Sequence, residues 1–278
     1  MMLARVMYEG GCGIALKVRN EIRFTPEPRD LDHFLHSHAG LAAAGQIAES
    51  GVRVDLADLK FLPPLSRAPK ILCLGLNFRD HAAEAQMRVP EFPTIFARFN
   101  SCLIGHGAPI IKPEVSDQLD YEGEMVAVIG RGGKYIALGD ALGHVAAYSV
   151  FNDASIRDYQ LKTPQWTVGK NFDSTGAFGP WLVTPDEVPA GASGLQLETR
   201  LNGEVVQSAS TAHMIFDVAH TIALLSKCMS LQAGDILVMG TPPGVGLART
   251  PPLFMKAGDR VEVEIEGIGL LSNPVQAA

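Results

Sequence analysis

The chain has 278 residues, of which 47% are hydrophobic and 19% are charged, and this composition is typical of a globular protein with a large core. Its net charge of −7 provides no basic surface for nucleic acid or for an anionic membrane, so we expect neither as a partner. No apolar run reaches the roughly 18 residues that span a bilayer, and we expect no signal peptide in the first ten residues.

The cysteines are scattered along the chain and form no C-x-x-C pair. Their pattern is typical of reduced, mostly buried thiols, and none lies in a motif that indicates a nucleophile. We therefore expect a cytoplasmic protein. The four positions are Cys12, Cys73, Cys102 and Cys228.

The first 65 residues are predicted to form a small leading unit. Strands at residues 5–8 and 13–18 are expected to form a hairpin, and a helix is expected from Asp30 to Ser50. The proline-rich stretch at residues 62–69 is typical of an extended linker. We therefore expect an N-terminal domain at residues 1–65 and a catalytic body at residues 66–278.

Short strands punctuated by glycine and proline dominate the chain after residue 70. Helical periodicity is confined to residues 80–87 and 214–226. Because the β-α-β alternation of a doubly wound sheet is missing, we predict an α+β or mostly-β fold. The strands are expected at residues 71–74, 94–99, 124–129, 145–150, 195–201, 236–239 and 261–265.

Three carboxylates are the strongest functional signal in the chain. Glu122 and Glu124 are two residues apart at the start of an apolar run, so on a strand both side chains lie on one face. Asp153 ends a second apolar run, and three such charges repel one another unless a cation lies between them. A hard divalent ion such as Mg²⁺ prefers carboxylate oxygens. The alternative is a solvated edge strand, which the apolar neighbours disfavour.

His81 and Glu84 form a second candidate group. They are three residues apart, so on a helix they share a face and can form a hydrogen bond. A carboxylate that orients an imidazole raises its basicity, which a general base for water requires. The alternative is an incidental pair on an exposed helix, and the spacing alone does not decide between the two.

Lys170 lies among glycines and aromatic residues in the segment 167–181. In a pocket, its ammonium group would hold a carboxylate or the developing charge of an enolate. The alternative is a lysine in a surface loop. Residues 239–246 contain two prolines that remove backbone donors a phosphate loop needs, so we interpret them as a rigid turn that presents Thr241 to a pocket.

Arg157 and Gln160 follow Asp153 closely, so we expect both near the metal. Arg157 can clamp a substrate carboxylate through paired N–H donors. A structural pair between Arg157 and Asp158 is an equally good interpretation of the sequence.

Taken together, these residues resemble the fumarylacetoacetate hydrolase family. The resemblance implies a mixed β-roll body with a small N-terminal domain, usually assembled as a homodimer. It also implies Mg²⁺, or alternatively Mn²⁺ or Ca²⁺, on Glu122, Glu124 and Asp153, with His81 and Glu84 on a lid and Lys170 in the pocket. The matching segments are GLNFRDHAAEA, LDYEGEMVAVIGRG, FNDASIRDYQ, GKNFDSTGAFGPW, LNGE, MIF, GDILVMGTPPGVG and GDRVEVEIEGIGLLSNPV, in this order.

Four positions depart from the family pattern. Phe78 replaces a frequent tyrosine, Arg98 a frequent lysine and Met239 a frequent threonine, while Gly123 stands where bulkier residues are common. None of them belongs to the carboxylate triad or to the His–Glu pair. We expect Phe78, Arg98 and Met239 to shape the substrate pocket.

Our leading hypothesis is Mg²⁺-dependent hydrolysis of a C–C bond in a 2,4-diketo acid of the acylpyruvate type. His81, oriented by Glu84, would activate the water, and Lys170 would stabilise the enolate that leaves. The first alternative is decarboxylation of a β-keto acid such as oxaloacetate, or isomerisation of a 2-hydroxydienoate, through the same enolate. The second is a non-catalytic module with a structural metal. A small keto acid and a second copy of the chain are the expected partners.

Overall fold

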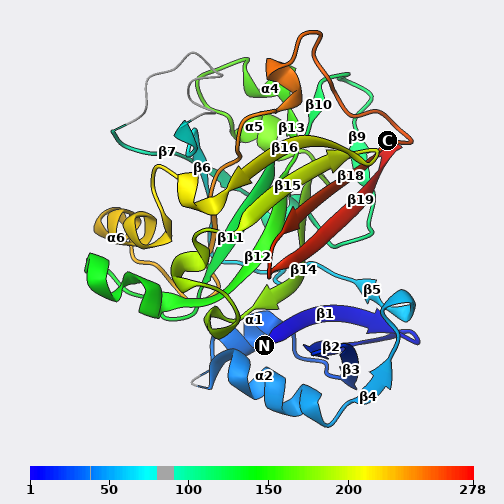
Figure 1. The fold of residues 1–278 in the computed structure, drawn as a ribbon, viewed down its shortest axis with the longest axis vertical. Coiled ribbons are helices and arrows are strands. Elements are labelled where there is room, and N and C mark those ends of the chain that lie inside the picture. The colour runs from blue at the N-terminus through cyan, green and yellow to red at the C-terminus, as the bar shows by residue number, and fades with distance from the viewer. Residues whose placement is uncertain (38, 80–90) are drawn as a thin grey trace.

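The computed structural model describes residues 1–37, 39–79 and 91–278, and Figure 1 shows its ribbon. Sheets dominate the described part and helices are few and short, so the predicted α+β class is confirmed. Within those residues, no helix has the length and apolar character needed to cross a membrane. The helix predicted at residues 80–87 lies outside the described residues.

One large sheet forms the centre of the molecule and, among the described residues, contains twelve strands. Short strands β5 (Lys60–Phe61) and β8 (Leu103–Ile104) pair with β1 and β14 at its side. The main order is β4 (Val52–Val54), β3 (Glu21–Pro26), β2 (Gly11–Val18), β1 (Met2–Tyr8), β14 (Gly176–Val183), β12 (Val145–Asp153), β11 (Gly123–Ile129), β17 (Ile236–Val238), β6 (Ile71–Gly75) and β7 (Thr94–Arg98).

A second sheet packs against the central strands of the first, as Figure 1 shows for β15, β18 and β19 in front of β11 and β12. A two-stranded ribbon of β10 (Leu119–Asp120) and β13 (Ser155–Ile156) lies beside them. The second sheet has the order β16 (Glu204–Ser210), β15 (Gln196–Leu201), β18 (Arg260–Ile265), β19 (Gly269–Ala277) and β9 (Ile110–Lys112).

Strand β11 is buried on both faces, which explains its unbroken apolar run. Met125 and Ala127 belong to the core that includes residues of the second sheet. Val126 and Val128 belong to the core on the opposite face, together with residues of helices α1 (Leu31–Leu35) and α2 (Gly40–Glu49). Glu124 therefore lies on a strand that is packed on both faces, and Glu122 directly precedes this strand.

The helix expected between Asp30 and Ser50 is two helices in the structure. Asp30 caps α1 by accepting a hydrogen bond from the backbone N–H of His33 at 3.0 Å. Gly40, at the start of α2, has a φ of 56°, a left-handed value that glycine adopts without a steric penalty. This turn separates the two helices.

The predicted strands of the body all coincide with observed strands, and the helix expected at residues 214–226 is α6 (Val218–Cys228). Strand β14 was not predicted, because Gly176, Gly179 and Pro180 interrupt its apolar pattern. The short helices α4 (Arg157–Gln160) and α5 (Thr167–Lys170) were not predicted either; they lie next to the site.

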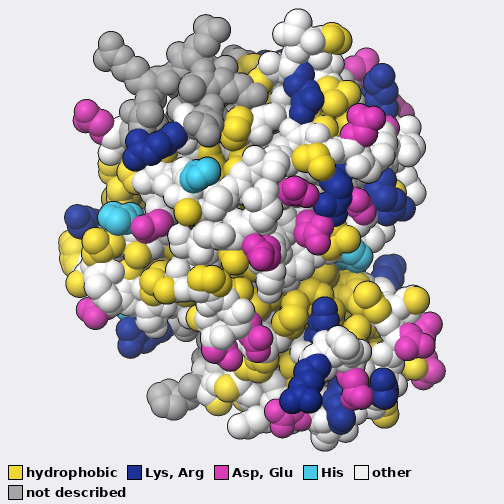
Figure 2. All heavy atoms as spheres, in the orientation of Figure 1, with side chains coloured by type: hydrophobic (Ala, Val, Ile, Leu, Met, Phe, Trp, Pro, Cys, Tyr) yellow, Lys and Arg dark blue, Asp and Glu magenta, His cyan; other side chains and the backbone are white. Residues whose placement is uncertain are grey.

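The N-terminal strands gather at one end of the molecule in Figure 1, and β1 joins β14 of the body through Met2–Val183 and Leu3–Leu182. Hydrophobic side chains gather where this end meets the body in Figure 2. Phe61 and Trp181 contribute to this junction, with ring centroids 5.4 Å apart. The domain boundary at residue 65 stays a prediction.

Candidate active site

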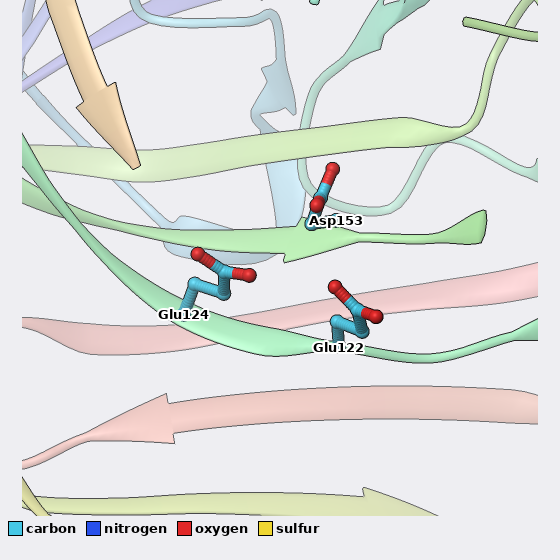
Figure 3. A group of neighbouring side chains, drawn as sticks. All are labelled: Glu122, Glu124 and Asp153. Carbon is cyan, nitrogen blue, oxygen red and sulfur yellow. The ribbon is translucent and has the colours of Figure 1, made fainter. Parts of the chain in front are cut away.

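Strand pairing brings the three predicted carboxylates together. Gly123 of β11 pairs with Asn152 of β12, and the backbone N–H of Asp153 donates to the carbonyl of Glu122 at 2.8 Å. This register places Asp153 beside the Glu122–Glu124 pair. Their carboxylate oxygens lie within 4.8 Å of one another, and all three residues are buried; Figure 3 shows the three side chains converging.

Three buried cations compensate part of this charge. The Lys170 ammonium donates to Glu122 Oε2 at 2.7 Å and to Asp153 Oδ2 at 2.5 Å. Arg157 Nη1 lies 2.6 Å from Glu122 Oε1, and Arg98 Nη1 donates to Asp153 Oδ1. Removing one member of such a buried network leaves an uncompensated charge, which is strongly destabilising.

Glu124 is the least compensated member of the triad. Burial raises the pKa of Glu124 well above its usual value, and the charges of Asp153 and Glu122 raise it further. Its Oε2 accepts a hydrogen bond from the backbone N–H of Gly240 at 2.5 Å. An anionic Glu124 therefore requires another positive charge nearby.

The donor set fits a hard divalent cation. It consists of carboxylate oxygens, which such ions prefer over nitrogen or sulfur ligands. With Asp120 included, the described cluster contains four carboxylates against three cations, which leaves one negative charge. A divalent ion would leave the cluster one positive charge, which favours an anionic substrate.

A cavity of about 320 Å³ opens beside the triad. Its lining combines charged and polar residues with apolar ones. The charged and polar residues are Glu122, Glu124, Arg157, Gln160, Lys170 and Thr241. The apolar residues include Leu74, Leu76, Phe96, Leu161, Trp166, Val245, Leu247 and Ala248.

The predicted pocket residues Lys170, Arg157, Gln160 and Thr241 all line this cavity. Their roles in binding and catalysis stay predictions. Asp153 is fully buried behind the lining, where Lys170 covers one of its oxygens. His81 and Glu84, and the lid on which the resemblance places them, lie outside the described residues, so both assignments stay predictions.

The guanidinium of Arg157 has one nitrogen, Nη2, that no described residue accepts from. Its Nε donates to Asp120 Oδ2 at 2.8 Å and its Nη1 to Gln160 Oε1 at 2.9 Å, in addition to the contact with Glu122. Its buried Nη2 has no hydrogen-bond partner among the described residues. The predicted alternative, a pair with Asp158, is not what holds Arg157, since Asp158 accepts from Ser116.

Lys170 remains a cation in this environment. Burial alone lowers the pKa of Lys170, but the neighbouring charges of Asp153 and Glu122 raise it above its usual value. The hydroxyl of Thr241 is also committed, because it donates to the carbonyl of Gly123 at 3.0 Å and accepts from Gln207 Nε2 at 2.8 Å. Thr241 can therefore offer a substrate only an acceptor lone pair.

Phe78, Arg98 and Met239 lie outside the lining of the cavity. All three are buried, and none lines the cavity. Arg98 instead reaches Asp153 from β7, because its guanidinium is long enough to fill the space between Asp153 and Thr175. Arg98, which departs from the family pattern, thus contacts a member of the triad directly.

Sequence reasoning did not identify Asp120, Gln207 or Trp166. Asp120 precedes Glu122 by two residues, so the D-x-E-x-E spacing contained a signal for it. Gln207 lies on β16 and connects Gly123 to Thr241, and no local pattern predicts such a contact. Trp166 is one of the apolar residues that line the cavity.

Comparisons with known proteins agree with this geometry. The family model described as "Fumarylacetoacetate (FAA) hydrolase C-terminal" matches residues 70–276. A mitochondrial oxaloacetate tautomerase of Rattus norvegicus is 44% identical over 220 residues, which are 79% of this chain and 70% of that protein. These matches confirm the family resemblance and the predicted fold class.

Solved structures of two enzymes are also similar over their whole length. A 5-carboxymethyl-2-hydroxymuconate delta-isomerase from Mycobacterium smegmatis has 30% identity and a TM-score of 0.81, with both chains covered completely. A maleylpyruvate hydrolase from Sphingobium sp. SYK-6, solved with manganese(II) and pyruvate, has 26% identity and a TM-score of 0.83, again with complete coverage of both chains.

The expectation of a cytoplasmic protein is contradicted by the curated relatives. Relatives from rat, cattle and human are named as mitochondrial. The expectation is wrong because it rested on unpaired cysteines, and the four cysteines are indeed free. Free thiols indicate a reducing environment but do not distinguish one reducing compartment from another.

Proposed function

This chain belongs to the fumarylacetoacetate hydrolase family, and on that premise we propose that it is a metal-dependent oxaloacetate tautomerase. The proposal corresponds to the alternative reaction class rather than to the leading hypothesis of C–C hydrolysis. The relatives named as oxaloacetate tautomerases support it, with 40% identity over 89% of this chain in the human protein. The buried acidic triad beside a cationic cavity wall is the structural observation that carries it.

Glu122, Glu124 and Asp153 would hold the cation, and we propose Mg²⁺ as its identity, with Mn²⁺ or Ca²⁺ as substitutes. The oxygen-only donor set supports a hard ion. When bound, such an ion supplies a Lewis acid that polarises a carbonyl oxygen and stabilises developing negative charge. The manganese in the maleylpyruvate hydrolase neighbour is consistent with this assignment.

Arg157 and Gln160 would bind and orient the substrate. Both residues line the cavity, and a guanidinium suits one carboxylate of a 2-oxo acid; Gln160 accepts from Arg157 Nη1 on the same helix, α4. Lys170 would act as a fixed positive charge beside the oxygen on C2. Without a metal ion, the charges of Asp153 and Glu122 raise the pKa of Lys170 above its usual value, which favours the charged ammonium.

Tautomerisation moves one proton between C3 and the oxygen on C2, so the reaction needs a group that carries that proton. We propose the predicted pair His81 and Glu84 for the step, with His81 as the proton carrier and Glu84 as the group that orients its ring.

An assay of product identity tests this function. Enol oxaloacetate should lose its ultraviolet absorbance in the presence of Mg²⁺ and protein, without release of pyruvate or CO₂. Release of both would instead identify a decarboxylase. Failure of the protein to accelerate the absorbance loss over Mg²⁺ alone would contradict the proposal.

Hydrolysis of a larger 2-oxo acid is a second candidate function. The apolar residues of the cavity lining, including Leu161, Trp166 and Leu247, offer contacts that a small dicarboxylate does not need. A neighbour is also named as a maleylpyruvate hydrolase. Pyruvate release from an acylpyruvate at a rate above that of oxaloacetate tautomerisation would favour this function over the first.

A further inference from the structure

We infer that Asp120 is a positioning residue that sets the substrate affinity of the site without touching substrate or metal. Asp120 lies at the end of β10, is fully buried and does not line the cavity. It connects two parts of the cavity wall that are far apart in sequence, namely Arg157 and the turn at residues 245–248. The inference rests on the proposed function only in that the cavity binds a 2-oxo acid.

Both carboxylate oxygens of Asp120 are fully engaged. Oδ1 accepts from the backbone N–H groups of Tyr121 and Gly246, each at 2.8 Å. Oδ2 accepts from the backbone N–H of Leu247 at 2.9 Å and from Arg157 Nε at 2.8 Å. A carboxylate buried with four donors is a strong acceptor in a fixed position.

The contact with Nε determines where the remaining nitrogens of Arg157 lie. A guanidinium group is planar, so fixing Nε on Asp120 and Nη1 on Glu122 and Gln160 fixes Nη2 as well. Nη2 is the donor without a partner among the described residues. Asp120 therefore holds the guanidinium of Arg157, a residue that lines the cavity, in one orientation.

The contacts with Gly246 and Leu247 fix a second part of the cavity lining. Leu247, Val245 and Ala248 are apolar residues of this lining. A Cβ atom at Gly246 would lie 1.9 Å from the carbonyl oxygen of Leu253 and 2.6 Å from Asp120 Oδ1, so only glycine permits this close approach. One carboxylate thus holds Arg157 and the apolar residues of the turn at 245–248 in a fixed relative position.

The variant Asp120→Asn tests this role. The amide keeps the volume, but one oxygen becomes an N–H donor that must face either Arg157 Nε or the backbone donors of the turn. Oxalate is the probe, and quenching of the Trp166 fluorescence at saturating Mg²⁺ reports its dissociation constant. We expect that constant to rise at least tenfold, and KM for enol oxaloacetate to rise similarly, while kcat changes less than threefold.

Asp235→Asn is the matched control. Asp235 is also fully buried and paired with a lysine, Lys70, at 2.8 Å, but it does not line the cavity. The Asp235→Asn variant should have a lower melting temperature than the wild type but the same oxalate dissociation constant. A dissociation constant for Asp120→Asn within twofold of the wild-type value would overturn the inference, as would an equal rise in Asp235→Asn.

A double variant separates positioning from general damage. If Asp120 acts through Arg157, Arg157→Lys should weaken oxalate binding, and adding Asp120→Asn should weaken it by less than threefold more. If the losses of oxalate affinity in the two single variants multiply in the double variant, Asp120 does not act through Arg157. Oxalate binding is measured without turnover, so the two proposals can fail separately. A wild-type protein that binds oxalate but has no tautomerase activity would refute the proposed function. The oxalate dissociation constants of the variants would still decide the role of Asp120.

Discussion

The raised pKa of Glu124 makes the stability of the fold depend on pH. Its pKa is raised in the folded protein because burial, Asp153 and Glu122 all disfavour the anion. In the unfolded chain, the carboxyl has the ordinary pKa of a glutamate side chain, near 4.5. Ionising Glu124 is therefore easier in the unfolded state, and folding stability is lost as the pH rises above that value.

We expect this loss to distinguish wild-type protein from Glu124→Gln. In metal-free protein, the free energy of unfolding of the wild type should fall relative to the variant as pH rises from about 4.5, by at most about 1.4 kcal/mol per pH unit. Urea unfolding at several pH values measures it. Saturating Mg²⁺ should reduce the fall, and a difference independent of pH would contradict the assignment.

The individual site residues were predictable to unequal degrees. The spacing of Glu122 and Glu124 predicted one shared face, because side chains alternate along a strand. Arg98 was named only as a family departure, and its contact with Asp153 depends on a pairing between distant strands. Local pattern carries no information about such contacts.

At the scale of elements, the close packing of β11 on the second sheet explains Gly123. A Cβ atom there would lie 2.1 Å from Thr199 Oγ1 and 3.0 Å from Val263 Cγ1. Thr199 of β15 thus fills the space that a side chain at position 123 would need. The two sheets, and not the turn chemistry of glycine, require this residue.

Gly123→Ala should therefore destabilise the protein by roughly 1–3 kcal/mol, as an overpacked core substitution. Because Gly123 lies between two triad members, the variant should also weaken Mg²⁺ binding. Chemical denaturation and calorimetric titration measure the two effects. Thr199→Ala removes the clashing hydroxyl, which has no hydrogen-bond partner among the described residues, so the double variant should recover most of both losses.

The elements themselves were predictable where pattern and propensity agree. Strands such as β11 and β12 are continuous apolar runs, and α6 has helical periodicity with Asp217 as its N-cap. The strand β14 was hidden because Gly179 and Pro180 oppose strand formation, and its pairing with β12 and β1 overrides that local preference. Tertiary context decides such segments.

At the scale of the whole molecule, the sheet is continuous from β1 to β7, so the N-terminal strands extend the same sheet that carries the triad. Charged side chains of both signs are interspersed on the face shown in Figure 2. The net charge of the chain is −7. The cationic groups Arg98, Arg157 and Lys170 are instead buried around the site.

The homodimer implied by the family resemblance stays a prediction at this scale. Light scattering coupled to size-exclusion chromatography should give twice the chain mass of 29.7 kDa. Dilution over a hundredfold range should not change the result if the dimer is stable. A mass of one chain at all concentrations would contradict the prediction.

The proposed reaction requires both a divalent cation on the triad and the charge of Lys170. The most direct test follows the ultraviolet decay of enol oxaloacetate with wild-type protein, Glu124→Gln and Lys170→Met, each with Mg²⁺ and with a chelator. We predict protein-dependent decay only for the wild type with Mg²⁺, with losses of at least a hundredfold in both variants. Wild-type decay that persists with chelator, or full activity in either variant, would contradict the account.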